Sequence, residues 1–551
     1  MNNSRFIHAR KMLAGSMLIM GACGIAYEYT LGALGNNLMG SSHEQIFVVI
    51  GLMMFAMGIG ATLQKNIAGN LITKFLLLEI ILGVTGGVSA LVIYFSYIFS
   101  SSYMLLLWGF SLGIGLLIGL EIPLLIRINR EYSESLKTNL SDILSMDYVG
   151  SLIGALLFTY VLLTWLAVDQ IAALLGCINL LIAIIGLMYF RPLVSHFKKL
   201  SVLGCASLTV LICLLVFSDN WRISLEQRTY RDPIIHSQTS KYQHIVLTKK
   251  NNRLSLYING HLQFNSQDEE IYHEMLVHVP FSVASSQEKV LILGGGDGLA
   301  LREVLKYRAV DEVHLVDIDP AITELASSHP DLIKLNQGAL MDSRVSLLAP
   351  GGVSPSEEYT VTRKTKLNRL LLSEQTYSNS SVHLFNVDAD RFIQESSDLY
   401  DLVIIDFSDP NSIGSAKLYS RDFYKNLAHR LKPNALIAVQ STSPYHSKEM
   451  FLCIGKTLRA SGYRALPYHQ NVPSFGEWGW HLAWEGGPEK AEMQNKLASI
   501  QSIPITTQYV TPQVVSTSMI FGKDWLNDDH IAINTKFQPT ILRYYRNSWK
   551  N

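Results

Sequence analysis

Residues 289–299, KVLILGGGDGL, decide the fold of the C-terminal half of this 551-residue chain. A short apolar run precedes three glycines and an aspartate, and the helix-like segment LREVLKY follows at 301–307. Small residues in such a turn let the backbone approach a ligand, and the N-terminus of the next helix favours negative or electron-rich groups. The stretch therefore predicts a strand, a ligand-binding turn and a helix.

The same alternation continues after this stretch. Apolar runs recur as EVHLVDID at 312–319, YDLVIIDF at 400–407 and ALIAVQ at 435–440, separated by helical patterns. Strands alternating with helices are typical of a parallel, doubly wound sheet. We predict a Rossmann-like, doubly wound α/β domain over 281–545, with a surface insertion rich in Ser, Thr, Gly and Lys at 346–381.

A small β subdomain is expected before the α/β domain. Residues 243–264 alternate apolar and polar side chains around Asn251-Asn252 and Asn259-Gly260, which are turn dipeptides. Two hairpins are the simplest interpretation, within a subdomain at 241–280.

The N-terminal half is apolar enough to meet lipid. The chain is 48% hydrophobic and only 16% charged. Runs of the roughly 20 residues that cross a bilayer lie at 12–36, 45–64, 75–98, 103–126, 143–167, 169–190 and 201–217. We predict an α-helical multi-pass membrane domain at 1–217, in the cell (inner) membrane, and a linker at 218–240.

Basic residues alternate along the membrane half. They cluster before the first run and after the second, fourth and sixth, which predicts that these segments are cytoplasmic. Seven crossings would then place the polar half outside, although the donor inferred below is cytosolic. Either 201–217 is re-entrant or interfacial and the catalytic domain is cytoplasmic, or that domain faces outward; we favour the first.

Two aspartates frame a nucleoside site. Asp317 ends the strand after the glycine turn, at the distance along the chain from Asp297 at which an acid reaches a ribose diol. The alternative is a tight turn and an ordinary carboxylate at a strand end. Asp297 would repel a pyrophosphate, so a nucleoside with a cationic tail, such as an S-adenosyl sulfonium, fits better than NAD.

Later strands end in acids as well. Asp388 either accepts a hydrogen bond from an adenine amino group or caps the next helix. Asp406 and Asp409 should face the same crevice as Asp297, because ligands lie beyond the carboxyl ends of parallel strands. Three acids around one pocket predict a cationic ligand. The net charge of zero gives no reason to expect binding to nucleic acid.

The ensemble of motifs resembles the polyamine aminopropyltransferase (spermidine synthase) family over 242–485. The motifs are GGGDG at 294–298, VDID at 316–319, DFSDP at 406–410, LYINGHLQF at 256–264 and DEEIYHEMLVH at 268–278. The apolar half, with CGIAYEYTLGAL at 23–34, GLEIPLL at 119–125 and DYVGSLIGALLF at 147–158, resembles the membrane segment of the multi-pass bacterial members.

The resemblance implies transfer of the aminopropyl group of decarboxylated S-adenosylmethionine to putrescine or a related amine, giving spermidine and 5'-methylthioadenosine. It implies no further cofactor and no metal, and it leaves a homo-oligomer open. Asp406 would be the catalytic proton acceptor. The implied amine or aminopropyl contacts are Tyr272, His273, Asp297 and Asp409. The implied nucleoside contacts are Gln243, Gly294, Gly296, Asp317, Asp388 and Ala389.

The chain departs from the family pattern in places. Asp317 stands where Glu is usual, and 471–478 (NVPSFGEW) lacks the Tyr that usually faces the amine. Phe475 or Trp478 would replace that wall and Glu477 would add an anionic contact, unless they are a core aromatic pair and a surface acid. The acceptor amine is therefore left open.

Two other functions remain as alternatives: an S-adenosylmethionine-dependent methyltransferase and a non-catalytic polyamine transporter or sensor. Acids within the apolar runs bear on the second. Glu28, Glu79, Glu121 and Asp147 either form a cation path or lie at the interface and bond to neighbouring helices.

Overall fold

The computed structural model describes residues 3–38, 43–100, 102–132, 135–341, 345–347 and 381–548. The chain divides into two compact units, Met1–Ile234 and Ile235–Asn551. The insertion predicted at 346–381 lies outside the described residues, apart from 346–347 and 381 at its two ends.

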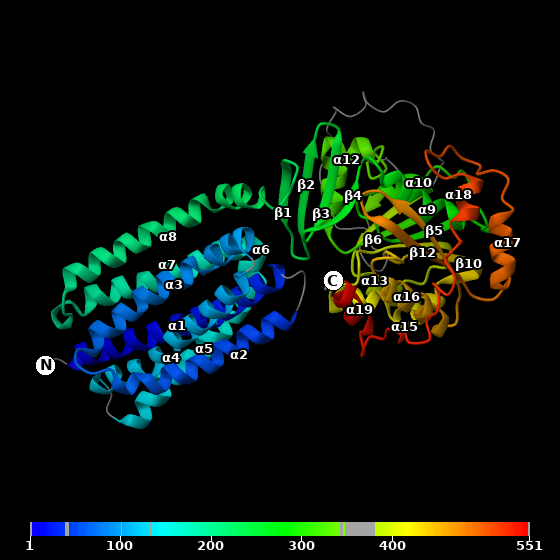
Figure 1. Ribbon diagram of the computed structural model, residues 1–551. Helices are drawn as coiled ribbons and strands as arrows, with labels where there is room; N and C mark the ends of the chain where they lie inside the picture. Colours follow the sequence, from blue (N-terminus) through cyan, green and yellow to red (C-terminus); the bar gives the residue numbers. More distant parts are fainter. Residues whose placement is uncertain are drawn as a thin grey trace. The chain divides into compact units, whose positions relative to one another are not determined.

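The first unit is a bundle of long helices (Figure 1). These are α1 (Asn3–Leu38), α2 (His43–Leu63), α3 (Leu71–Phe99), α4 (Tyr103–Asn129), α5 (Leu136–Leu157), the short α6 (Leu163–Trp165), α7 (Val168–Tyr189) and α8 (Phe197–Glu226). A π-helical stretch, Phe158–Leu162, joins α5 to α6. Among the described residues, seven helical segments are long and apolar enough to cross a membrane, and each contains most of one predicted run.

The predicted linker at 218–240 is wrong in part. Helix α8 continues to Glu226, and a strand, β1, occupies Ile234–Thr239. Hydropathy falls at Ser218 because polar residues begin there, but Trp221, Ile223 and Leu225 follow in a segment that still forms helix. A change in hydropathy reports the end of a membrane span and not the end of a helix.

Glycines set the spacing of the first unit. A Cβ built on Gly119 of α4 would lie 2.2 Å from the carbonyl oxygen of Met57 in α2, and one on Gly150 of α5 would lie 2.0 Å from that of Leu18 in α1. Small residues let membrane helices approach this closely. Of the predicted acids, Glu79 and Glu121 are fully buried next to each other, while Glu28 and Asp147 are half-buried.

A four-stranded sheet includes the predicted hairpins, in which β2, β3 and β4 pair antiparallel. Its strands are β1, β2 (His244–Lys250), β3 (Arg253–Ile258) and β4 (His261–Asn265), in that order. The two turns fall where expected, and Asn251, Asn259 and Gly260 have positive φ angles. The strand β1 was not predicted and extends the sheet.

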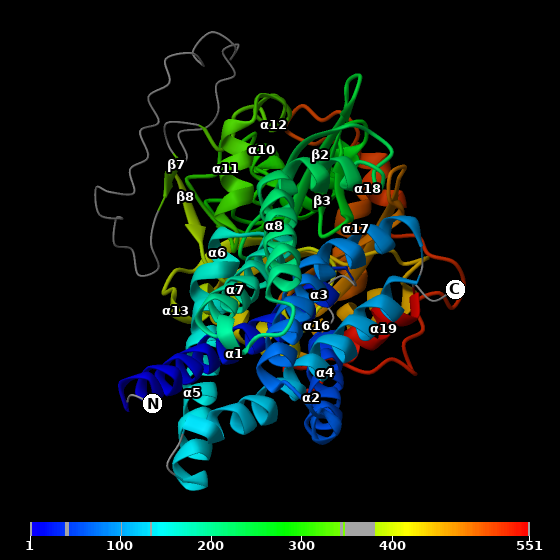
Figure 2. The ribbon, with the colours of Figure 1, turned by 90° about the vertical axis from the view of Figure 1, so that its left-hand side faces the viewer.

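The second unit is built on an eight-stranded mixed sheet in the order β11-β12-β10-β9-β5-β6-β8-β7. Its strands are β5 (Lys289–Gly294), β6 (Glu312–Asp317), β7 (Val345–Leu347), β8 (Ser381–Asn386), β9 (Tyr400–Asp406), β10 (Leu431–Gln440), β11 (Arg464–Val472) and β12 (Gly476–Trp484). Strands β5 to β10 are parallel, whereas β11 and β12 form an antiparallel hairpin. Figure 2 shows β7 and β8 side by side at one edge.

Helices cover both faces of this sheet, as a doubly wound fold requires. Alternate residues of β5 point to opposite cores: Val290 and Ile292 to one, Leu291 and Leu293 to the other. The first core takes α9 (Glu269–Phe281) and α10 (Leu299–Val304), and the second takes α13 (Ala389–Glu395), α15 (Arg421–Ala428), α16 (Lys448–Ala460) and α19 (Thr540–Ser548). The remaining helices are α11 (Pro320–Ser328), α12 (Pro330–Leu335), α14 (Ile413–Ala416), α17 (Lys490–Ala498) and α18 (Pro512–Thr517).

The chain places β6 on one side of β5 and β9 on the other. In open α/β sheets, ligands bind beyond the carboxyl ends of the strands at such a reversal of strand order. The predicted residues of the glycine turn and the predicted aspartates follow these strand ends, whereas Gln243 precedes β2 and Tyr272 and His273 lie on α9, Glu269–Phe281.

Candidate active site

The glycine turn after β5 fits closely against the end of β9. Gly294 pairs in register with Asp406, and a Cβ on Gly294 would lie 2.2 Å from the carbonyl oxygen of Asp406. Gly294 and Gly295 also have φ angles of 83° and 67°, which side chains rarely adopt. Glycine is therefore required here to bring the turn beside Asp406.

Asp317 lies on the other side of the same turn. Its Oδ2 accepts a 3.0 Å hydrogen bond from the backbone N–H of Gly296, and a Cβ on Gly296 would lie 2.6 Å from that oxygen. Its Oδ1 accepts a 2.9 Å bond from the N–H of Asp319. Burial raises the pKa of Asp317 to about 6, against the effect of these two bonds. The turn and the carboxylate thus fix each other's position.

The backbone of Gln243 is linked to the end of β6 through Ser240, a residue that was not among the predicted site residues. Its backbone N–H donates to the hydroxyl of Ser240 over 3.1 Å, and that hydroxyl donates to Asp319 Oδ2 over 2.7 Å. Asp319 is fully buried and its Oδ1 caps α11. The first turn of the small sheet is in this way held to the end of β6.

Asp406 is paired with Tyr272 of α9. The Tyr272 hydroxyl donates a 2.6 Å hydrogen bond to Asp406 Oδ1. Burial raises the pKa of Asp406, while the nearby His273 and the Tyr272 hydroxyl lower it in part. Asp406 is half-buried at the end of β9, and its carboxylate has a raised affinity for a proton.

His273 is part of a buried row of charges. Its Nδ1 lies 2.8 Å from Glu269 Oε2, and both oxygens of Glu269 accept from the guanidinium of Arg302, at 2.6 and 3.0 Å. Burial would lower the pKa of His273, but the hydrogen bond and the charge of Glu269 outweigh it and raise that pKa to about 9. A pKa of about 9 favours the protonated imidazole at neutral pH, within electrostatic range of Asp297 and Asp406.

Asp297 and Asp409 complete the acidic cluster. Burial raises the pKa of each to about 6. Asp409 accepts hydrogen bonds from Gln440 Nε2 over 3.2 Å and from the Thr442 hydroxyl over 3.3 Å. Tyr272 lies within electrostatic range of both Asp406 and Asp409. The structure thus brings together the acids that the sequence assigned to one crevice, and such a cluster attracts cations.

Asp388 is engaged elsewhere. Its Oδ1 accepts bonds from the N–H groups of Asp390 and Arg391, and its Oδ2 lies 2.6 Å from Lys417 Nζ. Of the two predicted roles of Asp388, the structure shows the helix cap: Asp388 caps α13, which begins at the buried Ala389. Adenine recognition by Asp388 and Ala389 stays a prediction.

The 471–478 segment divides between two sites. Phe475 lies 6.1 Å from Tyr272, ring centre to ring centre, and 4.9 Å from Trp478. Glu477 is instead paired with His469 and lines a separate cavity of about 500 Å³ between β11, β12 and Trp525. Alternation along β12 separates Glu477 from Trp478. Phe475 therefore lies beside Tyr272 with Trp478 next to it, whereas Glu477 lines the other cavity.

Several polar partners of the predicted residues were not predicted from the sequence. Glu269, Arg302, Gln440 and Thr442 hold the predicted residues in place. Glu269 had one signal, since it precedes His273 by one helical turn. Arg302 and Gln440 had none, because their partners come from distant elements.

Comparisons with known proteins identify the family of this chain. The sequence profile described as "Spermine/spermidine synthase domain" matches residues 269–363 and 362–495. The polyamine aminopropyltransferase of Oceanobacillus iheyensis is 34% identical over 556 residues, covering all of both chains. That of Leptospira interrogans is 34% identical over 97% of this chain and 98% of its own, and polyamine aminopropyltransferase 1 of Streptomyces coelicolor is 35% identical over 98% and 95%.

A crystal structure of spermidine synthase from Thermotoga maritima covers 53% of this chain and 87% of its own, with 22% identity and a TM-score of 0.40. The three relatives align over almost their whole length, so their similarity includes the helical unit as well as the catalytic one. The chain is a transferase enzyme and belongs to the polyamine aminopropyltransferase family.

Proposed function

We propose that this chain transfers the aminopropyl group of decarboxylated S-adenosylmethionine to putrescine or a related alkyl diamine, giving spermidine and 5'-methylthioadenosine. The observation that carries this proposal is the placement of Asp406. It lies at a strand end with a raised pKa, between a glycine turn on one side and Tyr272 on the other. The donor and the acceptor are both cations, which suits the acids around it.

The reaction is a displacement at carbon. The lone pair of an amine nitrogen attacks the carbon next to the sulfonium, the carbon–sulfur bond breaks, and its electron pair stays on sulfur as a neutral thioether. The nitrogen carries an extra proton after attack, and Asp406 accepts it. Positioning of both reactants in line supplies much of the rate enhancement.

A protonated amine has no lone pair, and aliphatic amines have a pKa near 10. Burial in the crevice lowers the pKa of the amine and raises that of Asp406. The two values approach each other, so the proton transfer becomes nearly balanced.

The neighbouring residues would position the two cations. Asp297 and Asp409 would bind the ammonium and aminopropyl groups, with His273 and Tyr272 beside them. Asp317 and Gln243 would hold the ribose, with Gly294 and Gly296 under the nucleoside and Asp388 and Ala389 at the adenine. Binding of the cations would remove the mutual repulsion of the carboxylates.

The test uses the purified full-length protein in detergent. With decarboxylated S-adenosylmethionine and a series of diamines, we expect 5'-methylthioadenosine in amounts equal to the new polyamine. Asp406→Asn should reduce kcat by about 10²- to 10⁴-fold, whereas Asp311→Asn, at an exposed site, should not. Absence of product with every amine, or an unchanged Asp406→Asn variant, would refute the proposal.

The same assay separates the alternatives. A methyltransferase would consume S-adenosylmethionine itself and release S-adenosylhomocysteine. A transporter or sensor would bind amines without releasing either nucleoside product.

We also propose that the catalytic unit faces the cytoplasm, where its donor is made. The seven apolar helices would then include one that does not cross, or an N-terminus on the outer side. In sealed inverted vesicles, added protease should cleave the second unit. Protection there, with cleavage in right-side-out cells, would place it outside.

A further inference from the structure

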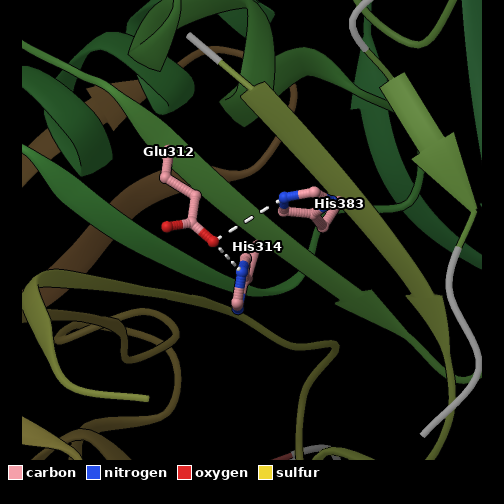
Figure 3. A group of neighbouring side chains, drawn as sticks. All are labelled: Glu312, His314 and His383. Atoms are coloured by element: carbon pink, nitrogen blue, oxygen red, sulfur yellow. Dashed lines mark hydrogen bonds and ion pairs between the residues drawn. The ribbon is translucent and has the colours of Figure 1, made fainter. Parts of the chain in front are cut away.

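Three potential metal ligands meet at the start of two parallel strands, away from the acidic cluster. Glu312 and His314 are on β6, and His383 is on β8 (Figure 3). His314 and His383 pair in register, and Glu312 lies two residues before His314, so alternation puts all three on one face. The sequence predicted no metal-ligand cluster, because His383 is far from His314 along the chain.

The donor atoms converge without rearrangement of the backbone. Glu312 Oε1 lies 2.7 Å from His314 Nε2 and 3.7 Å from His383 Nε2. One atom from each of the three residues falls within 4.8 Å of the others. Ligands about 2.0–2.1 Å from a tetrahedral Zn²⁺ are about 3.4 Å apart. The observed separations bracket this value, so small side-chain rotations suffice.

A second layer of contacts holds the ligands. The Tyr400 hydroxyl lies 2.8 Å from His314 Nδ1, the ring nitrogen that faces away from Glu312. Lys289 Nζ lies 2.9 Å from Glu312 Oε2, which leaves Oε1 toward the two histidines. Lys289 Nζ also lies 2.7 Å from Asp398. With neutral imidazoles, the two carboxylates of Glu312 and Asp398 and the one ammonium of Lys289 leave a net charge of minus one. Such outer contacts orient ligands in known metal sites.

The other group of close ligands among the described residues is different. Glu274 accepts from the backbone N–H groups of 508–510, and Glu303 is bonded to Arg302 and His278. These atoms are buried and already engaged. In contrast, Glu312 and His383 have side chains that are 30% and 26% exposed, so an ion can reach them from solvent.

We propose that Glu312, His314 and His383 bind a divalent transition-metal ion of the Zn²⁺ class. Two imidazoles and one carboxylate suit zinc, and leave the fourth position of a tetrahedral ion for water. The ligands lie at the first and third residues of β6, about 10–16 Å along the strand from Asp317 at three to five residues of 3.3 Å each. The ion therefore takes no part in the transfer chemistry and acts by joining β6 to β8.

Joining these strands has a structural consequence. Residues 314 and 383 are linked by a long connection, and an ion bound to the folded chain alone stabilises it by mass action. We expect added Zn²⁺ to raise the thermal midpoint of the full-length protein.

The test titrates metal-free full-length protein, without a polyhistidine tag, with Zn²⁺ in the presence of a competing chromophoric chelator. We expect one ion per chain, at micromolar affinity or tighter. His383→Gln and Glu312→Gln should each weaken binding by at least tenfold and abolish the thermal shift. His429→Gln, an exposed histidine elsewhere, should match the wild type.

Co²⁺ provides an independent readout, since a tetrahedral site with two histidines gives visible absorption bands. Wild-type protein should show them and His383→Gln should not. Aminopropyl transfer by the wild type should change less than twofold on metal removal. Wild-type affinity no greater than that of His383→Gln, or an equal Zn²⁺ affinity in Glu312→Gln, overturns the proposal.

Discussion

The Tyr272 hydroxyl donates a 2.6 Å hydrogen bond to Asp406 Oδ1, across 134 positions of sequence. This bond orients the predicted proton acceptor and also lowers its pKa, against the larger effect of burial. Tyr272→Phe should therefore reduce kcat about tenfold or more. It should also raise the pKa of Asp406 further, because one stabilising donor to the ionised form is lost.

The sign of the pH effect follows. Asp406 accepts a proton only when ionised, so kcat/KM falls as pH drops below its pKa. The acidic limb of the pH profile should lie at higher pH in Tyr272→Phe than in the wild type. Tyr242→Phe, at an exposed tyrosine, is the control. A parallel loss of activity at every pH would mean that Tyr272 only packs against substrate.

Gly296 is the position where a single methyl group should block the donor. The Cβ of Gly296→Ala would lie 2.6 Å from Asp317 Oδ2 and from Ile322 Cγ2, so Asp317 must move from the position in which we propose that it binds the ribose. We expect KM for the donor to rise at least tenfold, with KM for the amine changed much less. Gly522→Ala has open space around it and should behave as wild type. Equal changes in both KM values would argue against a nucleoside role.

Two substitutions of Asp388 distinguish its role as a helix cap from a contact with adenine. Asp388→Asn keeps an acceptor for the N–H groups of Asp390 and Arg391 but loses the charge that pairs with Lys417. Asp388→Ala loses both, at a cost of about 0.5–2 kcal/mol in the free energy of unfolding. If Asp388 also binds adenine, KM for the donor should rise several-fold in Asp388→Ala and little in Asp388→Asn. An unchanged KM in both would leave only the cap.

The fold was predictable where pattern and packing agree. Runs such as VLIL in β5 are buried on both faces, as the strands of parallel sheets are, and the turn at Asn259-Gly260 carries its own conformational signal. The end of α8 and the strand β1 were not predictable from the sequence. The apolar pattern stops at Ser218, whereas the helix continues to Glu226. Hydropathy measures contact with lipid, which the remaining turns of α8 do not need.

The candidate site residues at the ends of strands could be predicted from the sequence, but their side-chain partners on other elements could not. Asp317 and Asp406 follow apolar runs, so topology alone brings them to one edge. The partners Arg302, Gln440 and Lys417 come from other elements, and no local pattern marks them. Glu477 and Trp478 were predicted for one wall, and period-two alternation in β12 separates them. Chain topology places backbone, whereas side-chain partners depend on packing that the sequence does not display.

Asp409 gives a pH dependence of stability with a definite sign. Its folded pKa, about 6, lies above its ordinary value of 3.8 because it is buried. The folded chain therefore holds this proton more tightly than the unfolded chain, and the stability from it is greatest below about pH 4 and lost as pH rises through 6. Asparagine does not titrate, so the thermal midpoint of Asp409→Asn relative to wild type should rise between about pH 4 and pH 7. A constant difference would show that the folded pKa is not raised.

The helical unit depends on close backbone contact between α2 and α4. A Cβ on Gly119 would lie 2.2 Å from Met57 O, and the backbone carbonyl cannot turn aside as a flexible side chain does. Gly119→Val should therefore separate the helices, at a cost of about 1–3 kcal/mol in the free energy of unfolding. Gly113→Val, on the same helix with nothing within 4 Å, is a matched control and should keep the wild-type midpoint. Thermal unfolding of both variants in detergent measures the difference, and equal midpoints would mean that α2 and α4 do not pack in this way. If catalysis is independent of the helical unit, Gly119→Val should retain wild-type kcat at temperatures below its own midpoint.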